Sequence, residues 1–153
     1  MSIYVNLVET RIRCTPLAFF SLVAIPDAWP RFHPVTAAVF PIVGSTAEIA
    51  TVGTRFGERL KRADGLIEAH WEVTACDPGR AFVFRSTKFA DLPITMTISY
   101  MLETSGEHTS ITRLMRTDVQ AGHVLPRETA IHFSLPDVHE RFLATLAAHL
   151  TSA

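Results

Sequence analysis

The chain has 153 residues, which suits one domain with a real hydrophobic core and is too short for two such domains. Its 14 basic and 15 acidic residues give a net charge of −1, and its longest basic cluster is the short group at positions 59–62, so no nucleic-acid partner is expected. Apolar residues make up 48% of the chain, which predicts either a densely packed core or a cavity with apolar walls.

Other classes of protein are also disfavoured. The longest nearly unbroken apolar stretch, residues 17–25, is less than half the ~20 residues that a membrane-spanning helix needs. The amino terminus has no basic region followed by an apolar block and a cleavage site, so we expect no signal peptide and a cytoplasmic location. Cys14 and Cys76 lack the spacing of a disulfide framework and are expected to be free, buried thiols. The scattered histidines do not have metal-ligand spacing, so no metal and no other cofactor is expected.

Residues 3–13 alternate as a β-strand does, although apolar side chains fall on both faces. Ile3, Val5 and Leu7 share one parity and Val8 takes the other, so the pattern predicts either a bulge or burial on both faces.

Two short helices are predicted after this strand. Thr15 followed by Pro16 indicates a helix start, with Thr15 as N-cap and Pro16 in the first turn. Residues 17–25 are apolar on every side, which is typical of a fully buried helix. Asp27 is expected to cap a second helical turn, which Pro30 keeps short.

The middle of the chain alternates with period two, as antiparallel strands do. The predicted strands are residues 35–43, 54–62, 67–74, 82–86, 94–102 and 109–119, joined by a polar loop at 44–53 and tight turns at Asp64-Gly65, Asp77-Pro78-Gly79 and Ser105-Gly106. The inward side chains are predicted to be Phe56, Glu58, Leu60, Ile67, Ala69, Trp71, Val73, Phe82, Phe84, Ser86, Ile94, Met96, Ile98, Tyr100 and Leu102.

The register of the last strand is ambiguous, because two sets of side chains compete for the inner face. We favour the set that contains Ile111, Arg113 and Met115 over the set that contains Thr112, Leu114 and Arg116. Only the first register directs the Arg113 guanidinium into the protein.

The carboxyl-terminal segment predicts a helix. Residues 120–133 are irregular, with a helical turn expected after Pro126. Residues 134–137 fit a capping box, and Leu135, Val138, Phe142, Leu146 and Leu150 repeat at helical spacing. The order of elements is α+β, and a strongly bent sheet gripping the last helix would leave a hollow between them.

Several motifs together resemble the START-like helix-grip superfamily (SRPBCC). They are Thr15-Pro16-Leu17, Trp29-Pro30-Arg31-Phe32-His33-Pro34, Gly53-Thr54-Arg55-Phe56, Trp71-Glu72-Val73-Thr74, Asp77-Pro78-Gly79-Arg80 and the closing amphipathic helix. The most similar branch is that of the bacterial polyketide cyclase/dehydrase-type proteins, and the resemblance spans residues 1–153 as one domain. It implies a curved antiparallel sheet of about seven strands around the carboxyl-terminal helix, with an apolar cavity between them. It implies no single catalytic residue set.

One departure from the pattern of this superfamily lies near the carboxyl terminus. Pro126 and Pro136 interrupt what is commonly a longer terminal helix, so the shape of the cavity entrance is open.

Three polar residues are candidates for catalysis. An inward Glu58 among aromatic side chains would have a raised pKa and could transfer protons, although it could instead reach solvent or pair with an arginine such as Arg113. Tyr100 could bond a ligand oxygen or be an ordinary core tyrosine, and an inward Arg113 could polarise a carbonyl.

Apolar candidates would form the walls of the cavity. They are Phe56, Trp71, Phe82, Phe84, Met96, Ile98 and Phe142, with Trp29, Phe32 and His33 expected at the rim by the resemblance. Core packing alone would demand the same apolar residues, so only a measured void separates a cavity from a packed core.

The resemblance implies a protein that binds a hydrophobic, polyketide-like or polycyclic ligand and promotes its cyclisation or dehydration, as a monomer or homodimer. Two alternatives stay open. One is a non-catalytic carrier of a lipid, quinone or secondary metabolite, which predicts an almost wholly apolar cavity. The other is a module that docks a protein through an aromatic rim at Trp29 and Phe32, which predicts a large exposed apolar patch and no cavity.

Overall fold

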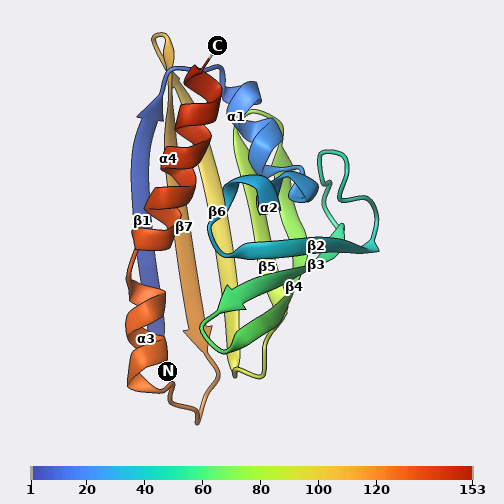
Figure 1. The fold of residues 1–153 in the computed structure, drawn as a ribbon, viewed down its shortest axis with the longest axis vertical. Coiled ribbons are helices and arrows are strands. Elements are labelled where there is room, and N and C mark those ends of the chain that lie inside the picture. Colours follow the sequence, from blue (N-terminus) through green and yellow to red (C-terminus); the bar gives the residue numbers. More distant parts are fainter. Residues whose placement is uncertain (1, 153) are drawn as a thin grey trace.

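A sheet of seven antiparallel strands forms the frame of the computed structural model, which describes residues 2–152 (Figure 1). The strands are β1 (Ile3–Ile12), β2 (Thr36–Val43), β3 (Arg55–Arg62), β4 (Gly65–Asp77), β5 (Ala81–Phe89), β6 (Ile94–Ser105) and β7 (His108–Val119). Their spatial order is β1-β7-β6-β5-β4-β3-β2, so each strand from β3 to β7 pairs with the one before it, and β1 pairs with β7. The predicted α+β architecture of seven strands is confirmed.

The sheet is strongly bent. The β2–β3 pairing shifts register twice, between Thr36 and Ala38 and between Pro41 and Val43, and the β4–β5 pairing also shifts twice. Such irregularities increase local twist and bend a strand. In Figure 1, β2 and β3 run across the direction of β1 and β7, which turns one face of the sheet into a concave surface.

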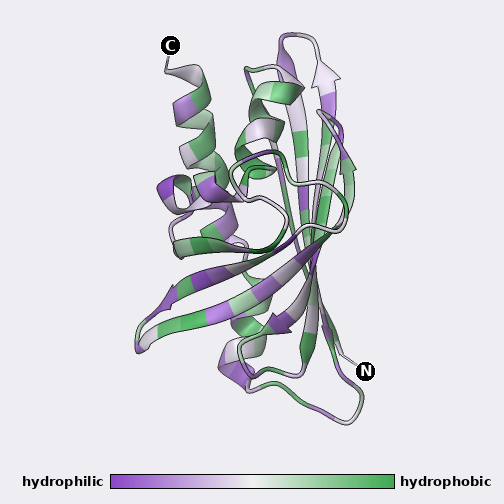
Figure 2. Cartoon of the chain, turned by 90° about the vertical axis from the view of Figure 1, so that its right-hand side faces the viewer, coloured by the Kyte–Doolittle hydropathy of each residue, from purple (hydrophilic) through white to green (hydrophobic). Residues whose placement is uncertain are grey.

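Five helical segments follow β1 or β7 in the chain. They are α1 (Pro16–Val23), the 3-10 helix η1 (Pro26–Ala28), α2 (Trp29–Phe32), α3 (Arg127–Ser134) and α4 (Asp137–Thr151). The helices lie on one side of the sheet (Figure 2), and α4 extends along β1 and β7 in Figure 1. The prediction of a carboxyl-terminal helix held by the curved sheet is confirmed. No helix within residues 2–152 is both long and apolar enough to span a membrane.

The alternation of strand residues determines which side chains reach the concave face. Arg113 is buried, with 2% of its surface exposed, so the favoured register of β7 is confirmed. β1 differs from both expectations, because its pairing with β7 contains no bulge and its burial is one-sided. Val8 faces the core, while Ile3, Val5 and Leu7 are exposed. The mixed apolar parity of β1 therefore reflects a solvent-facing apolar row.

The first helices are less buried than their apolar sequence suggests. The Thr15 hydroxyl accepts a hydrogen bond from the Ala18 amide at 3.2 Å, which confirms the predicted N-cap. Leu17 is exposed, so the prediction of a helix buried on every side was wrong. α1 covers the sheet with one face only. The prediction for Asp27 was also wrong, because Asp27 lies inside the first turn of η1 and caps no helix.

The carboxyl-terminal helical region is broken at Leu135 and Pro136. The predicted capping box is not formed: the Ser134 hydroxyl donates to the Ala130 carbonyl oxygen at 2.9 Å, and Pro136 occupies the N-cap position of α4. Leu135 stands before the helix and is exposed, whereas Phe142 and Leu146 of the predicted stripe are buried and Val138 and Leu150 are partly buried. Pro136 therefore separates α3 from α4, while Pro126 occupies the N-cap position of α3.

Gly57 allows an aromatic ring to cover the outer face of the β2–β3 pair. Phe40 is its partner across the two strands, and a Cβ added to Gly57 would lie 2.0 Å from the Phe40 Cζ. The guanidinium of Arg59 lies 4.9 Å from the centre of the same ring. Only glycine leaves room for the Phe40 ring, which packs over this strongly twisted part of the sheet.

Candidate functional site

A cavity of about 280 Å³ lies between the concave face of the sheet and the helices α3 and α4. At the ~30 Å³ that a water molecule occupies in the liquid, it has room for on the order of ten waters. Ten of the thirteen predicted site residues line it: Glu58, Tyr100, Arg113, Trp29, His33, Trp71, Phe84, Met96, Ile98 and Phe142. The interior is hollow, as a ligand-binding protein requires.

Three predicted site residues do not line this cavity: Phe56 and Phe82, expected in its walls, and Phe32, expected at its rim. Phe56 packs edge-on against Trp29, with ring centres 5.2 Å apart, and Phe82 packs against Phe20 at 6.0 Å. Phe32 is buried against the His149 ring at 4.9 Å. The helices that follow β1 fill this end of the concave face, so inward side chains there are packed core.

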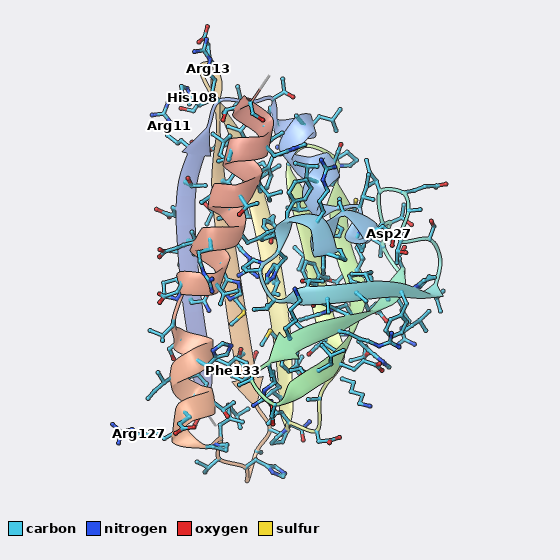
Figure 3. The ribbon with its side chains drawn as sticks, in the orientation of Figure 1. Arg11, Arg13, Asp27, His108, Arg127 and Phe133 are labelled. Atoms are coloured by element: carbon cyan, nitrogen blue, oxygen red, sulfur yellow. The ribbon has the colours of Figure 1, made fainter. Side chains whose placement is uncertain are left out.

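The sequence reasoning missed the residues that close the cavity from the helical side. Phe133 points from α3 towards the sheet in Figure 3, while Arg127 of the same helix points away. Phe133 also contacts Phe89, at 5.8 Å between ring centres, and both line the cavity together with His139 of α4. The helical spacing of residues 127–134 could have indicated an inward Phe133, but only the packing of α3 shows where it points.

Glu58 lies on the inner face of β3, between a hydroxyl and an indole. Thr36 donates its hydroxyl hydrogen to Oε2 at 2.6 Å, and the Trp71 Nε1–H donates to Oε1 at 3.1 Å. Burial raises the pKa of the Glu58 carboxyl, and the bonds from Thr36 and Trp71 and the charge of Arg113 offset only part of that effect. A hydroxyl can also accept, so the same geometry suits the protonated acid with its hydrogen directed at Thr36.

Arg113 and Tyr100 are neighbours on β7 and β6. The Arg113 Nε–H donates to the Tyr100 hydroxyl oxygen at 3.0 Å, across a directly paired position. Within residues 2–152, no carboxylate lies within ion-pairing distance of Arg113, so the alternative of a direct Glu58–Arg113 pair is not realised. Burial raises the pKa of the Tyr100 phenol, which keeps its proton.

Two histidines face the same region from the helical side. Burial, together with the positive charge of Arg113, lowers the pKa of His33 to about 3 and that of His139 to about 2, so both rings are neutral near neutral pH. The His33 Nδ1 accepts the Val35 amide hydrogen at 3.3 Å, which places the ring proton on Nε2. The His139 Nδ1 is buried and has no hydrogen-bond partner in the described part of the chain.

The open end of the cavity is at the joint between α3 and α4. The lining residues that are exposed to solvent are all in this region: His132, Leu135, Asp137 and Arg141. The helix break at Pro136 therefore forms the mouth, at the place where the sequence departs from an unbroken terminal helix.

The remaining polar candidates take no part in this site. Cys14 and Cys76 are free as expected but half-buried, and neither lines the cavity. Across the chain from residue 2 to residue 152, no cluster of three His, Cys, Asp or Glu side chains could hold a metal ion. The site offers one buried carboxyl for proton transfer, one buried cation, a phenol and two neutral imidazoles.

Comparisons with known proteins place the fold but not the activity. No family model matches the chain, and no curated protein matches it. Among solved structures, Ara h 8.0201 superposes with a TM-score of 0.77 at 12% identity, over 99% of this chain and 100% of that one. Ginseng major latex-like protein 151 from Panax ginseng gives 0.76 at 17% identity, over 97% and 98%. The Zhui aromatase/cyclase from a Streptomyces species gives 0.77 at 12% identity, over 97% and 94%. These likenesses confirm the fold that the sequence motifs indicated.

Proposed function

We propose that this chain, which has the START-like helix-grip fold, binds a hydrophobic polyketide-like or polycyclic molecule in its cavity and promotes cyclisation or dehydration. The observation that carries the proposal is a buried carboxyl, Glu58, in the wall of the same cavity as the Arg113 and Tyr100 pair. The likeness to an aromatase/cyclase structure supports the proposal at the level of the fold.

Binding would depend on the aromatic and sulfur-containing walls. Trp71 and Phe84 stand edge to face with ring centres 5.0 Å apart, and Met96 adds an adaptable side chain beside them. The volume of about 280 Å³ is just below the ~300–1,000 Å³ typical of ligand pockets. A ligand of one or two fused rings fits this space, and a larger polycycle needs α3 and α4 to move apart.

Catalysis would combine proton transfer with stabilisation of an oxyanion. In the ionised form, Glu58 removes the proton next to a ligand carbonyl, and the resulting enolate oxygen faces Arg113 and Tyr100. The protonated Glu58 then returns this proton to a β-hydroxyl, which leaves as water while the C–C double bond forms. A raised pKa suits both roles, because it keeps the acid and base forms closer in population near neutral pH. These steps are proton transfers that need no cofactor.

The cavity would contribute by folding a flexible substrate. Enclosure by the sheet and helices holds the reacting carbons close together and excludes water, which lowers the entropic part of the barrier.

The two alternatives are less well supported. A non-catalytic carrier predicts Glu58 and Arg113 outside the cavity, whereas both line it. A docking module predicts an exposed aromatic rim, whereas Trp29 and Phe32 are buried, with 5% and 7% of their surfaces exposed.

The test begins with a native mass spectrum of freshly purified protein. We expect a mass excess that disappears on denaturation, and the released molecule identifies the ligand for a turnover assay. The wild-type chain should convert it to a product that has lost water, while Glu58→Gln should bind the ligand and lose turnover by roughly 100-fold or more. Glu9→Gln, on the exposed outer face of β1, is the matched control. Equal turnover in Glu58→Gln and wild type would remove Glu58 from the mechanism.

A further inference from the structure

Arg113 is a buried cation without a counter-ion. Only 2% of its surface is exposed, and its only hydrogen bond within residues 2–152 goes from Nε to the neutral Tyr100 phenol. Its Nη1 is buried with no acceptor in the same part of the chain. A buried, unpaired charge lowers the stability of the folded chain, so the free N–H donors of this guanidinium call for a partner from outside the chain.

The other titratable groups of the cavity do not supply that partner. Glu58 is engaged by Thr36 and Trp71, and its burial favours the protonated form. Asp137 is exposed at the mouth. His33 and His139 are neutral and cannot compensate a cation. The closed part of the cavity therefore carries a net positive charge that comes from Arg113.

The neighbours of Arg113 also suit an anion. The proton of His33 is on Nε2, because its Nδ1 accepts the Val35 amide, so this ring presents a donor. A guanidinium is a planar fork that binds both oxygens of a carboxylate or of a delocalised oxyanion. Aromatic walls on one side and an unpaired guanidinium on the other describe an amphipathic ligand with one negative end.

We propose that the ligand is an aromatic or polyketide-derived acid, bound as its anion with the carboxylate on Arg113. The inference rests on the proposed binding of a small molecule in this cavity and names its chemical class. A neutral ligand would leave the guanidinium without a counter-ion, whereas a carboxylate supplies one and keeps the rings against Trp71 and Phe84. The Tyr100 hydroxyl, which accepts from Arg113, still has its own hydrogen to donate to an enolate oxygen.

A matched pair of probes tests the charge alone. 2-Naphthoate and 2-naphthamide have the same rings and nearly the same size, but only the first is an anion near neutral pH. Both tryptophans of the chain, Trp29 and Trp71, line the cavity, so quenching of intrinsic fluorescence reports its occupancy directly. We expect the wild-type chain to bind naphthoate roughly tenfold tighter than naphthamide, or better, since a charge-assisted bond is at stake.

Three variants identify the source of this preference. Arg113→Met removes the cation while keeping much of its volume, and should bring the two dissociation constants to about equal values by weakening naphthoate binding. Arg113→Lys keeps the charge without the fork and should restore part of the preference. Arg116→Met, on the same strand but the outer face, should preserve the wild-type ratio.

The outcomes separate the two proposals. Wild-type protein that binds the amide as tightly as the acid would overturn the anionic ligand and leave the cavity as a binding site. A preference that survives in Arg113→Met would also overturn it. If neither probe binds to wild-type protein, the proposed ligand-binding function fails as well.

Discussion

The Arg113 guanidinium and the Tyr100 phenol meet at 3.0 Å across paired strands, with the arginine as donor and an uncharged oxygen as acceptor. The bond fixes the direction of the guanidinium without neutralising it, because burial holds the phenol in its protonated form. The guanidinium is therefore held in a fixed direction but has no negative charge beside it.

In the absence of ligand, Arg113→Met should increase the free energy of unfolding by about 1 kcal/mol or more, because it removes a buried charge that nothing in the chain compensates. Urea denaturation monitored by circular dichroism measures the change. Arg116→Met, which removes an exposed arginine paired with Asp118, should alter stability by less than about 1 kcal/mol. A loss of ~3 kcal/mol or more in Arg113→Met would mean that the cation is already paired in the folded protein.

Glu58→Gln should change how stability depends on pH. The folded-state pKa of Glu58 is raised above its ordinary value of 4.5, so the unfolded chain releases this proton first as the pH rises. The contribution of Glu58 is fully present below 4.5 and is lost as the pH rises through the folded-state pKa. Relative to Glu58→Gln, the wild-type chain should therefore lose stability as the pH increases above 4.5. Urea midpoints across this range measure the difference, and a constant difference would contradict a raised pKa.

His139→Leu should have the opposite pH signature. The folded-state pKa of His139 is about 2 against an ordinary 6.5, so on acidification the unfolded chain takes up a proton before the folded chain does. Its contribution is present above 6.5 and is lost as the pH falls towards the folded value. The variant should lose less stability than the wild type below 6.5, with His33 still supplying a slope of the same sign. His123→Gln, at an exposed position, is the control. If His139→Leu lost as much stability as the wild type below pH 6.5, the His139 ring would not be buried in its neutral form.

Gly57→Ala should destabilise the chain by roughly 1–3 kcal/mol, because the new methyl group and the Phe40 ring cannot occupy the same space. The clash is on the outer face of the sheet, so naphthoate affinity should change little in protein that remains folded. Combining Gly57→Ala with Phe40→Ala should recover part of the loss, as expected for two groups in direct contact. Additive losses in the double variant, measured by urea denaturation, would show that the ring does not cover Gly57.

Local sequence signals were sufficient for most of the fold. Period-two alternation from Ile94 to Leu102 identified the inner face of β6, and the Asp64-Gly65 turn identified the β3–β4 hairpin. The same signals failed where tertiary packing decides. Leu17 and Ile3 are apolar yet exposed, because an apolar residue is not obliged to be buried at the edge of a small domain.

The sequence predicted which strand side chains point inward, but not which of them border the cavity. Alternation showed that Phe56 and Phe84 point to the same side of the sheet. It could not show that Trp29 packs against both rings, or that Phe84 borders the cavity while Phe56 does not. His139 was missed for a similar reason. Its neighbour Val138 belongs to the apolar stripe, and the sequence does not show how α4 is rotated against the sheet, which brings the His139 imidazole to the cavity.

That break has a consequence for how the architecture can diversify. The rim consists of a few side chains around one hinge between two helices, whereas the chamber behind it is made by strands whose hydrogen bonds fix their spacing. The entrance to the cavity and its interior are therefore formed by different parts of the chain. Substitutions at this joint can change which molecular shapes enter, while the cavity residues on the strands keep their positions.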